Sequence, residues 1–425
     1  MPRMDRLYVT GGARLAGSVR ISGAKNSALK LMAASLIAPG RSVLRNVPRI
    51  QDCFTMAEVL EHLGAGVTWE DGRVVVDATH LSSVDAPYEL VRRMRASIAV
   101  LGPLLARTGE ASVAMPGGDN IGSRPIDLHL EGLRRMGARI DAEHGFLLAR
   151  TGGLHGASIT LDYPSVGATE NLMMAAVTAD GVTVIDNAAR EPEITDLAAY
   201  LAAMGAGIRG AGSATIEVEG VAKLTPAEHT VIPDRIEAGT WAAAAVATRG
   251  DVLLKGARPD HLELFLEKLA EGGAAIRVMD EGIRIHQPER TRAADFVTLP
   301  YPGLATDFQP ILLAMLATAN GTSIATENVF EGRFTYVDEL RRMGADIRTE
   351  GHHAVIRGVE QLSAAPVRAM DIRAGAAMAI AALTADGVSE IADIDHVDRG
   401  YEDFEAKLTA LGAEVRRDPE LVRLP

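Results

Sequence analysis

The stretch TMAEVLEHLGAGVTWEDGRVVV, residues 55–76, contains the pattern that decides the fold. Thr55 and Glu58 have the T-x-x-E spacing of a capping box, which predicts that a helix starts there. Apolar residues follow at the i, i+3, i+4 and i+7 spacing of one helix face: Met56, Val59, Leu60 and Leu63. Gly64 stands where a left-handed helix end favours glycine. Asp71-Gly72 lies between two extended runs and predicts a β-hairpin.

This ending recurs along the chain. A Gly-Ala pair follows the apolar face of a predicted helix six times. Successive glycines of these pairs are 73, 68, 68, 71 and 68 residues apart: Gly64, Gly137, Gly205, Gly273, Gly344 and Gly412. A second series of glycines precedes short β-branched runs at steps of 69, 72, 69, 71 and 66: Gly40, Gly109, Gly181, Gly250, Gly321 and Gly387. Two independent markers with one period of about 70 residues indicate six copies of one unit.

The first copy shows the order of elements within a unit. Residues 18–21 are expected to be extended, residues 25–37 helical and residues 42–44 a strand, before the helix and hairpin described above. The unit is therefore strand–helix–strand–helix–strand–strand, an α/β (α+β) pattern. Since each copy buries its apolar faces only against its neighbours, we expect two lobes of three units, with the break near residues 220–231.

Composition narrows the class of protein. Hydrophobic residues make up 47% and charged residues 23% of the 425 residues, as in ordinary soluble globular proteins. The single cysteine, Cys53, allows no internal disulfide and favours a reduced, cytoplasmic location; we expect it to be structural. No apolar run is long enough for a signal peptide or membrane helix. The net charge of −13 argues against nonspecific nucleic-acid binding.

Two segments depart from the repeat. In Ser22–Asn26 (SGAKN), Lys25 stands at the start of a predicted helix, where a cation opposes the helix dipole and so suits anion capture; the alternative is a solvated surface lysine. Residues 116–125 (PGGDNIGSRP) form a glycine-rich loop with one acid and one arginine. They lack the Lys-Ser/Thr of a nucleotide-triphosphatase loop, and Pro125 stands at a plausible first helical position.

Arginines also occur outside the repeat pattern: Arg95, Arg124, Arg235, Arg333, Arg373 and Arg399. Each one alone could belong to a structural ion pair, but so many in an acidic chain indicate a site for a polyanionic substrate. Asp307 precedes a helix of the fifth unit and could be its N-cap. With no Cys/His cluster and no G-x-G-x-x-G after a strand, the sequence implies neither a metal nor a nicotinamide cofactor.

Taken together, these residues resemble the UDP-N-acetylglucosamine 1-carboxyvinyltransferase family over essentially the whole chain. The motifs that carry the resemblance are ISGAKN (21–26), MRAS (94–97), PGG…IG.RP (116–125), PSVGATEN (164–171), NAAREPEI (187–194), PDRIEAGT (233–240), NVFEGRF (328–334), DIRAG (371–375) and HVDRGY (396–401). The resemblance implies the enolpyruvyl transferase fold, an inside-out α/β barrel. Its lobes would be residues 22–231, with the catalytic loop, and residues 1–21 plus 232–425, with the active site in the cleft.

The implied reaction transfers the enolpyruvyl group of phosphoenolpyruvate to the 3-hydroxyl of UDP-N-acetylglucosamine and releases phosphate. This is the first committed step of peptidoglycan precursor synthesis, so the resemblance also implies roles in cell-wall biogenesis, cell shape, cell cycle and cell division. Both partners would be small-molecule substrates in the cytoplasm, with no nucleic acid or membrane involved. No cofactor is implied, because the activated group arrives on phosphoenolpyruvate.

The resemblance also implies residue roles. The phosphoenolpyruvate site would consist of Lys25, Asn26, Arg124, Arg373 and Arg399, with Asp371 beside them. The sugar-nucleotide site would consist of Asn26, Arg95, Arg124, Pro125, Ile126, Asp127, Leu128, Ser165, Val166, Gly167, Asp307 and Val329. The catalytic residues would be Lys25, Asp119, Asp307 and Arg399, with Asp307 as the base for the sugar hydroxyl.

Asp119 stands where most members of the family have a cysteine. A carboxylic acid can supply the proton for C3 of phosphoenolpyruvate if nearby substrate anions raise its pKa from about 3.9. Fosfomycin alkylates the loop thiol of cysteine members, and a carboxylate is a much poorer nucleophile toward that epoxide. We therefore expect this protein to be insensitive to fosfomycin.

Three other readings compete with this one. The sister enzyme that acts on shikimate 3-phosphate shares the six-unit fold, but the PGG loop and PSVGATEN match the sugar-nucleotide branch. A paralogue could enolpyruvylate another uridine nucleotide in natural-product synthesis. A non-catalytic repeat protein such as a DNA clamp would not need Lys25, Asp119, Arg124, Asp307 and Arg399 together.

Overall fold

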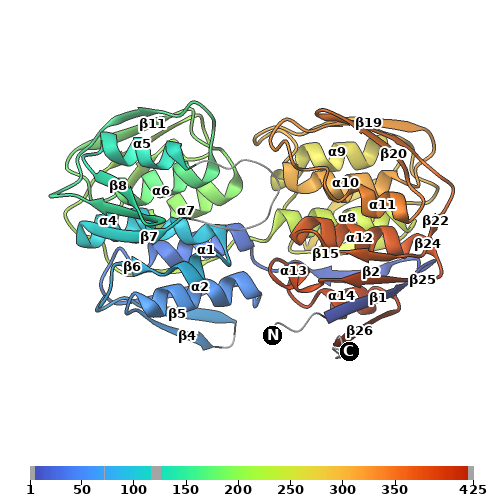
Figure 1. Cartoon of the computed structure of the whole chain (residues 1–425), viewed down its shortest axis with the longest axis horizontal. Coiled ribbons are helices and arrows are strands. Elements are labelled where there is room, and N and C mark those ends of the chain that lie inside the picture. Colours follow the sequence, from blue (N-terminus) through green and yellow to red (C-terminus); the bar gives the residue numbers. More distant parts are fainter. Residues whose placement is uncertain (1–4, 71, 116–125, 420–425) are drawn as a thin grey trace. The chain divides into compact units, whose positions relative to one another are not determined.

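The computed structural model describes residues 5–70, 72–115 and 126–419 (Figure 1). Contacts between residues divide the described chain into two compact units. The N-terminal unit comprises residues 23–115 and 126–232, and the C-terminal unit comprises residues 5–22 and 233–419. Each unit has its own hydrophobic core.

Three four-stranded sheets surround each core, which confirms the six-copy repeat. In the N-terminal unit the sheets are β14 (Glu228–Thr230), β3 (Arg41–Arg45), β5 (Arg73–Asp77), β4 (Gly66–Glu70); β6 (Asp85–Ala86), β7 (Glu110–Ala114), β9 (Phe146–Arg150), β8 (Arg139–Glu143); and β10 (Ser158–Thr160), β11 (Val182–Asp186), β13 (Thr215–Glu219), β12 (Gly207–Arg209). The first pair in each sheet is parallel and the others are antiparallel.

The C-terminal unit repeats this arrangement. Its sheets are β2 (Ala16–Arg20), β15 (Asp251–Lys255), β17 (Gly282–His286), β16 (Ala275–Met279); β18 (Phe296–Val297), β19 (Thr322–Thr326), β21 (His353–Arg357), β20 (Asp346–Glu350); and β23 (Pro366–Arg368), β25 (Val388–Ala392), β1 (Asp5–Thr10), β26 (Val415–Pro419). A short parallel pair joins β22 (Leu362–Ser363) and β24 (Ala385–Asp386).

Three helices are central in each unit. They are α1 (Lys25–Ala34), α4 (Leu101–Thr108) and α6 (Val166–Ala176) in the N-terminal unit, and α8 (Arg235–Ala247), α10 (Gln309–Leu316) and α12 (Ile372–Leu383) in the C-terminal unit. Every residue of α10 and α12 is buried, as expected for helices that are apolar on all sides. The expected inside-out arrangement, with helices inside and sheets outside, is therefore present in each unit (Figure 1).

The remaining helices are shorter or amphipathic. In the N-terminal unit they are α2 (Gln51–His62), α3 (Tyr88–Val91), η1 (Arg95–Val100), α5 (Asp127–Arg135) and α7 (Pro192–Ala203). In the C-terminal unit they are η2 (Pro259–His261), α9 (Glu263–Glu271), η3 (Thr306–Phe308), α11 (Val337–Arg342), α13 (Asp395–Asp398) and α14 (Phe404–Ala410). Among the described residues, no helix is both long and apolar enough to cross a membrane.

Strand pairing links copies that are far apart in sequence. The strand read as the start of the first copy, β2, pairs with β15 of the fourth copy, while β14, which precedes the fourth copy, pairs with β3 of the first. The two copies thus exchange their edge strands. In the sixth copy, β26 pairs with β1 from the other end of the chain, so its hairpin is split between the termini.

The repeated glycines have the backbone conformation that the pattern predicted. The Gly-Ala glycines all have positive φ, at 100°, 94°, 108°, 101°, 90° and 95° for Gly64, Gly137, Gly205, Gly273, Gly344 and Gly412. In the second series, the fourth copy differs: the left-handed residue there is Arg249, with φ of 54°, rather than Gly250.

The predicted start of the second helix is wrong. α2 begins at Gln51 with Ile50 as its N-cap, and Thr55 lies buried inside it. Its apolar face extends upstream through buried Ile50 and Cys53, so packing determines the start. Glu58 accepts a hydrogen bond from Arg93 Nη1 (2.6 Å) instead of capping the helix. The hairpin prediction is confirmed, since β4 and β5 pair antiparallel.

Replacing Gly412 with alanine tests the role of the positive-φ glycines. A Cβ at Gly412 would contact no described atom within 4 Å, so its φ of 95° alone penalises the variant. We expect Gly412→Ala to lower the free energy of unfolding by about 1–2 kcal/mol. Gly66→Ala is the matched control, because its Cβ would make ordinary 3.7 Å contact in β4. Equal losses in denaturant titrations of both variants would contradict this account.

Candidate active site

The candidate residues gather at the N-terminal ends of the central helices. In the N-terminal unit, Lys25 is the first residue of α1, Arg95 is the first residue of η1, which leads into α4, and Ser165 is the N-cap of α6. In the C-terminal unit, Asp307 lies in η3 before α10 and Arg373 lies in the first turn of α12. Helix N-termini present unpaired N–H groups and the positive end of the dipole, which favours anionic ligands.

Lys25 is not a solvated surface residue. It is 7% exposed, and its Nζ lies 2.7 Å from Oδ2 of Asp52, itself 2% exposed, in the first turn of α2. A buried ion pair fixes the ammonium in place at the start of α1. Asp52 was missed by the sequence analysis; an acid in the first turn of a helix, directly before the buried Cys53, was the available signal.

A second buried ion pair lies one turn along α1. Lys30 Nζ contacts Glu170 Oε2 of α6 at 2.8 Å and donates to the backbone oxygen of Asn26 (3.3 Å). Asn26 is itself half-buried in the first turn of α1. Burial raises the pKa of Glu170 to about 7, although the charge of Lys30 opposes the shift. Glu170 thus lies close to its protonation midpoint at neutral pH.

Arg95 lies near a neutral histidine that the sequence analysis did not select. Burial, followed by the charges of Arg95 and Lys30, lowers the pKa of His129 to about 3. Asn171 Nδ2 donates to His129 Nδ1 at 2.9 Å. A Cβ on Gly167 would lie 3.1 Å from the His129 ring, so glycine there permits this close approach.

The predicted sugar-nucleotide segments lie at two helix starts. Ser165 Oγ accepts a hydrogen bond from Ala168 N (3.3 Å), and Val166 and Gly167 form the first turn of α6. Ile126 is the N-cap of α5. The helix begins at Asp127, which Leu128 follows. The predicted roles of Asp119, Arg124 and Pro125 fall outside the described residues.

In the C-terminal unit, Asp307 pairs with Arg373. Arg373 Nε donates to Asp307 Oδ1 at 2.8 Å; the arginine side chain is 6% exposed and the aspartate side chain 33%. Asp307 is therefore not an N-cap, and η3 has Ala305 in that position. Asp371 is the N-cap of α12, since its Oδ1 accepts from Arg373 N (2.7 Å) and Ala374 N (3.0 Å).

Positive charge dominates around Asp307. Burial raises the pKa of its carboxyl, but the charges of Arg373, Arg333 and Arg235 outweigh burial and hold that pKa well below its usual range. Arg333 is 3% exposed and belongs to the loop before α11. Nη1 of Arg373 is buried with no hydrogen-bond partner among the described residues. The surroundings of Asp307 thus contain several guanidinium groups, which keep its carboxylate ionised.

The guanidinium of Arg373 is held on its other side by an aromatic ring. It lies 5.4 Å from the ring centroid of Tyr401, whose hydroxyl contacts Thr240 Oγ1 at 2.8 Å. Arg399 is half-buried at the end of α13, and a Cβ on the next residue, Gly400, would lie 3.7 Å from Arg373 Nη1. The Arg399 segment therefore packs beside Arg373.

Val329 belongs to a loop that a buried acid organises. Glu327 Oε1 accepts hydrogen bonds from Val329 N (2.8 Å) and Phe330 N (3.1 Å), and its Oε2 accepts from Thr306 Oγ1 (2.9 Å). Glu327, 1% exposed, thereby ties the Val329 loop to the residue before Asp307. No sequence pattern indicated Glu327 as a candidate site residue. Within the described ranges, no group of three or more His, Cys, Asp or Glu residues could hold a metal.

Comparison with known proteins identifies the family of this chain. A family model described as EPSP synthase (3-phosphoshikimate 1-carboxyvinyltransferase) matches residues 9–408. A relative from Corynebacterium jeikeium named UDP-N-acetylglucosamine 1-carboxyvinyltransferase is 54% identical, over 97% of this chain and 99% of its own length. A relative of the same name from Mycobacterium bovis is 53% identical over the same shares. The chain belongs to the UDP-N-acetylglucosamine 1-carboxyvinyltransferase family.

Solved structures share the fold of this carboxyvinyltransferase family member. The enolpyruvyl transferase NikO from Streptomyces tendae is 26% identical with a TM-score of 0.89, covering 99% of this chain and 100% of that one. EPSP synthase from Acinetobacter baumannii is 19% identical with a TM-score of 0.76, covering 98% of this chain and 100% of that one. The predicted enolpyruvyl transferase fold is confirmed.

The shifted pKa of Glu170 predicts a pH-dependent stability. Its carboxyl binds a proton more tightly in the folded protein than in the unfolded chain. Its contribution to the free energy of unfolding is therefore fully present below pH 4.5 and is lost as pH rises through about 7. We expect the free energy of unfolding to fall by about 1.4 kcal/mol per pH unit within this window. Because His129 titrates too, the measurement is the difference between wild type and Glu170→Gln in urea denaturation from pH 4 to 8. A pH-independent difference would contradict the assignment.

Proposed function

We propose that this chain transfers the enolpyruvyl group of phosphoenolpyruvate to the 3-hydroxyl of UDP-N-acetylglucosamine and releases inorganic phosphate. The observation that carries the proposal is identity of 52–54% to relatives named for this activity, over 97% of the chain. EPSP synthases, by contrast, are 19–20% identical. In a cell the reaction belongs to the cytoplasm, where it would begin peptidoglycan precursor synthesis and so support growth and division.

The reaction needs two anionic groups to be held and neutralised. Lys25 and Arg373 are buried cations at helix starts in their respective units, and each is held by a carboxylate at 2.7 Å and 2.8 Å. We assign the phosphate and carboxylate of phosphoenolpyruvate to Lys25, Arg124, Arg373 and Arg399, with Asn26 beside them. A guanidinium with a spare buried donor, such as Arg373 Nη1, suits a bidentate bond to an oxyanion.

The sugar nucleotide would use the helix starts of the N-terminal unit. Arg95 and the Ser165–Gly167 turn offer a guanidinium and helix N–H groups, which suit phosphate oxygens. The segment from Arg124 to Leu128 and Val329 complete this assignment.

Asp307 is the proposed base. It is ionised throughout the neutral range, so it can accept a proton from the 3-hydroxyl, but its pairing with Arg373 makes it a weak base in the free protein. An anionic substrate that engages Arg373 would compete for that guanidinium and raise the basicity of Asp307. The oxygen freed of its proton attacks C2 of phosphoenolpyruvate.

Asp119 is the proposed acid. Its proton goes to C3, which gives a tetrahedral intermediate with a methyl group. Loss of a proton from that methyl group, with departure of phosphate from C2, restores the double bond of the enolpyruvyl product. The same carboxyl can take part in both proton transfers, because the first leaves it as a base.

The direct test is release of phosphate from phosphoenolpyruvate by the purified protein. We expect release with UDP-N-acetylglucosamine and none with UMP or shikimate 3-phosphate, together with a sugar-nucleotide product heavier by one enolpyruvyl group. If the protein released phosphate with shikimate 3-phosphate but not with UDP-N-acetylglucosamine, it would have the activity of the sister enzyme and this proposal would be wrong.

Asp307→Ala tests the base. We expect kcat to fall by about 10²–10⁴-fold, the range for an acid–base group, with a smaller change in sugar-nucleotide affinity. Asp338→Ala is the control, because Asp338 is an exposed acid that pairs with Arg341 at 2.7 Å. A loss of less than about tenfold would leave Asp307 as a positioning group for Arg373.

Asp119 variants test the acid. Wild type should resist time-dependent inactivation by fosfomycin, while Asp119→Cys should remain active and become sensitive. Asp119→Asn should lose most turnover, because an amide cannot deliver the proton. Activity should fall with rising pH as Asp119 ionises, at lower pH than in the cysteine variant, whose thiol has an ordinary pKa of about 8.5. Covalent labelling of wild type by fosfomycin, or full activity of Asp119→Asn, would exclude this role.

A further inference from the structure

The loops that follow α6 and α10 are equivalent in the third and fifth copies. Four backbone hydrogen bonds have matching partners in the two copies: Asp180 N to Leu154 O and Asn320 N to Thr291 O; Gly156 N to Asp180 O and Ala293 N to Asn320 O; Gly220 N to Gly181 O and Gly358 N to Gly321 O; Val221 N to Val177 O and Val359 N to Ala317 O. Each residue of one loop therefore has a defined counterpart in the other.

In the C-terminal unit, one arginine side chain satisfies the carbonyl groups of this loop. Arg290 Nε donates to Thr318 O at 2.9 Å, and its Nη2 donates to Ala319 O (3.1 Å) and Val359 O (2.8 Å). The same Nη2 lies 3.5 Å from Gly358 O. A single guanidinium thus binds a cluster of carbonyls just beyond the C-terminus of α10, where the helix dipole favours a cation.

The corresponding position in the N-terminal unit is Gly153. It directly precedes Leu154, as Arg290 precedes Thr291, and the hydrogen-bond partners above make these two pairs equivalent. The carbonyls that match those bound by Arg290 belong to Thr178, Ala179, Gly220 and Val221. Within the described part of the chain, no backbone or side-chain group donates a hydrogen bond to these four carbonyls.

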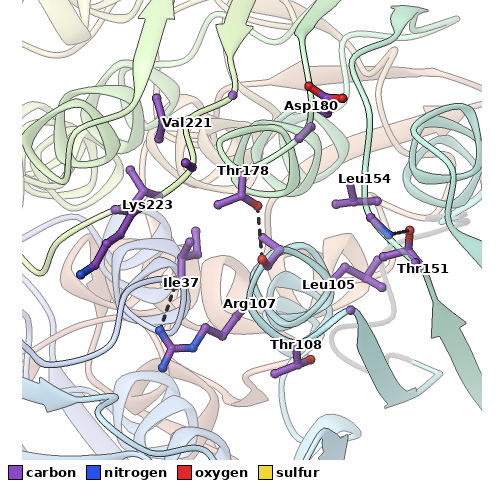
Figure 2. Close-up of a pocket in the computed structure, with 18 of the residues that line it drawn as sticks. Ile37, Leu105, Arg107, Thr108, Thr151, Leu154, Thr178, Asp180, Val221 and Lys223 are labelled. Atoms are coloured by element: carbon purple, nitrogen blue, oxygen red, sulfur yellow. Dashed lines mark hydrogen bonds between the residues drawn. The ribbon is translucent and has the colours of Figure 1, made fainter.

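A cavity of about 840 Å³ opens where the arginine is replaced. Thr178, Ala179, Gly220 and Val221 all line it, together with the Gly152-Gly153 turn. Figure 2 labels Thr178 and Val221 in this lining. The volume of the cavity lies within the range of about 300–1,000 Å³ typical of small-ligand sites. The residues that correspond to those whose carbonyls accept a guanidinium in the C-terminal unit therefore line open space in the N-terminal unit.

Two cations line the same cavity. Arg107, at the end of α4, and Lys223 have no ion-pair partner within the described ranges. Arg107 is half-buried, burial lowers its pKa, and its Nη1 makes only a long contact of 3.5 Å to Ile37 O (Figure 2). Asp180 adds one exposed carboxylate on the far side of the cavity from Lys223 in this view.

We propose that this cavity binds a ligand of the arginine class, with a guanidinium group at one end and a carboxylate at the other. The guanidinium takes the place of the Arg290 side chain and donates to the carbonyls of Thr178, Ala179, Gly220 and Val221. The carboxylate pairs with Arg107 and Lys223. A simple cation would leave those two charges unpaired, and a simple anion would leave the carbonyls without donors.

The site is separate from the proposed active site. Lys25 and Ser165 lie at the N-terminal ends of α1 and α6, whereas Ile37 and Thr178 follow the C-terminal ends of the same helices. A helix of the length of α6 spans about 16 Å. Arginine-class ligands are therefore expected to bind together with phosphoenolpyruvate rather than compete with it.

Calorimetric titration of the full chain with N-acetylarginine is the primary test. We expect saturable binding of one molecule per chain, at least about tenfold tighter than that of methylguanidinium, which lacks the carboxylate. N-acetylcitrulline, in which a neutral urea replaces the guanidinium, should not bind. Equal binding of N-acetylcitrulline, or equal binding of inorganic phosphate, would overturn the proposal in favour of an anion site.

Three variants locate the binding. Gly153→Arg places the protein's own guanidinium at the cavity and should abolish binding; because Gly153 has φ of 147°, Gly152→Arg is the second, unstrained version. Gly145→Arg is the matched control, since it adds the same charge at an exposed positive-φ glycine with no described atom near its Cβ. Binding that survives in both cavity variants, or disappears equally in the control, would overturn the assignment.

The C-terminal unit offers an independent test of the carbonyl cluster itself. Arg290→Ala should lower the melting temperature, and methylguanidinium at millimolar concentration should restore part of the loss, whereas tetramethylammonium at equal ionic strength should not. Equal effects of both cations would show that this loop geometry does not select a guanidinium.

Discussion

Three largely buried helices pack together in each unit, so mainly their ends are available to a ligand. Every residue of α10 and α12 is buried, and the sheets cover the flanks of the helices. Apart from ion pairs along the helices, such as that of Lys30 with Glu170, polar side chains are therefore concentrated at the N-terminal and C-terminal ends of the helices. The N-terminal ends attract anions and the C-terminal ends attract cations, because each helix has a dipole with its positive end at the N-terminus. The proposed substrate sites and the proposed arginine-class site follow from this single constraint.

The buried cations at the N-terminal ends are paired with carboxylates. Lys25 with Asp52 and Arg373 with Asp307 are held at hydrogen-bond distance with little exposure of the cation. Removing one member of a buried pair typically costs about 3–5 kcal/mol, so these pairs are rigid elements of the fold as well as preorganised anion receptors. The same pairing explains why the Asp307 carboxylate stays ionised and why a substrate that competes for Arg373 can change its basicity.

The repeat was predictable because each copy has glycine at the same position, where the backbone needs a positive φ. Gly205 and Gly344 are examples, and a side chain at either position would be unfavourable. The start of α2 was not predictable, because the burial of Ile50 and Cys53 outweighed the capping signal at Thr55. Strand exchange between β2 and β14 depends on long-range pairing, which no local pattern contains. Among the candidate residues, Lys25, Asp307 and Arg373 were noticed in the sequence. Asp52, Glu327 and His129 were missed, because their ion pairs and hydrogen bonds arise from tertiary contacts.

Enolpyruvyl transfer can be told apart from phosphoryl transfer by the fate of the bridging oxygen of phosphoenolpyruvate. With ¹⁸O placed between C2 and phosphorus, attack of the sugar oxygen at C2 breaks the carbon–oxygen bond. The account therefore predicts that the label leaves with inorganic phosphate and is absent from the enolpyruvyl product. Retention of the label on the carbon skeleton would show that the phosphorus–oxygen bond breaks, as in phosphoryl transfer, and would contradict enolpyruvyl transfer.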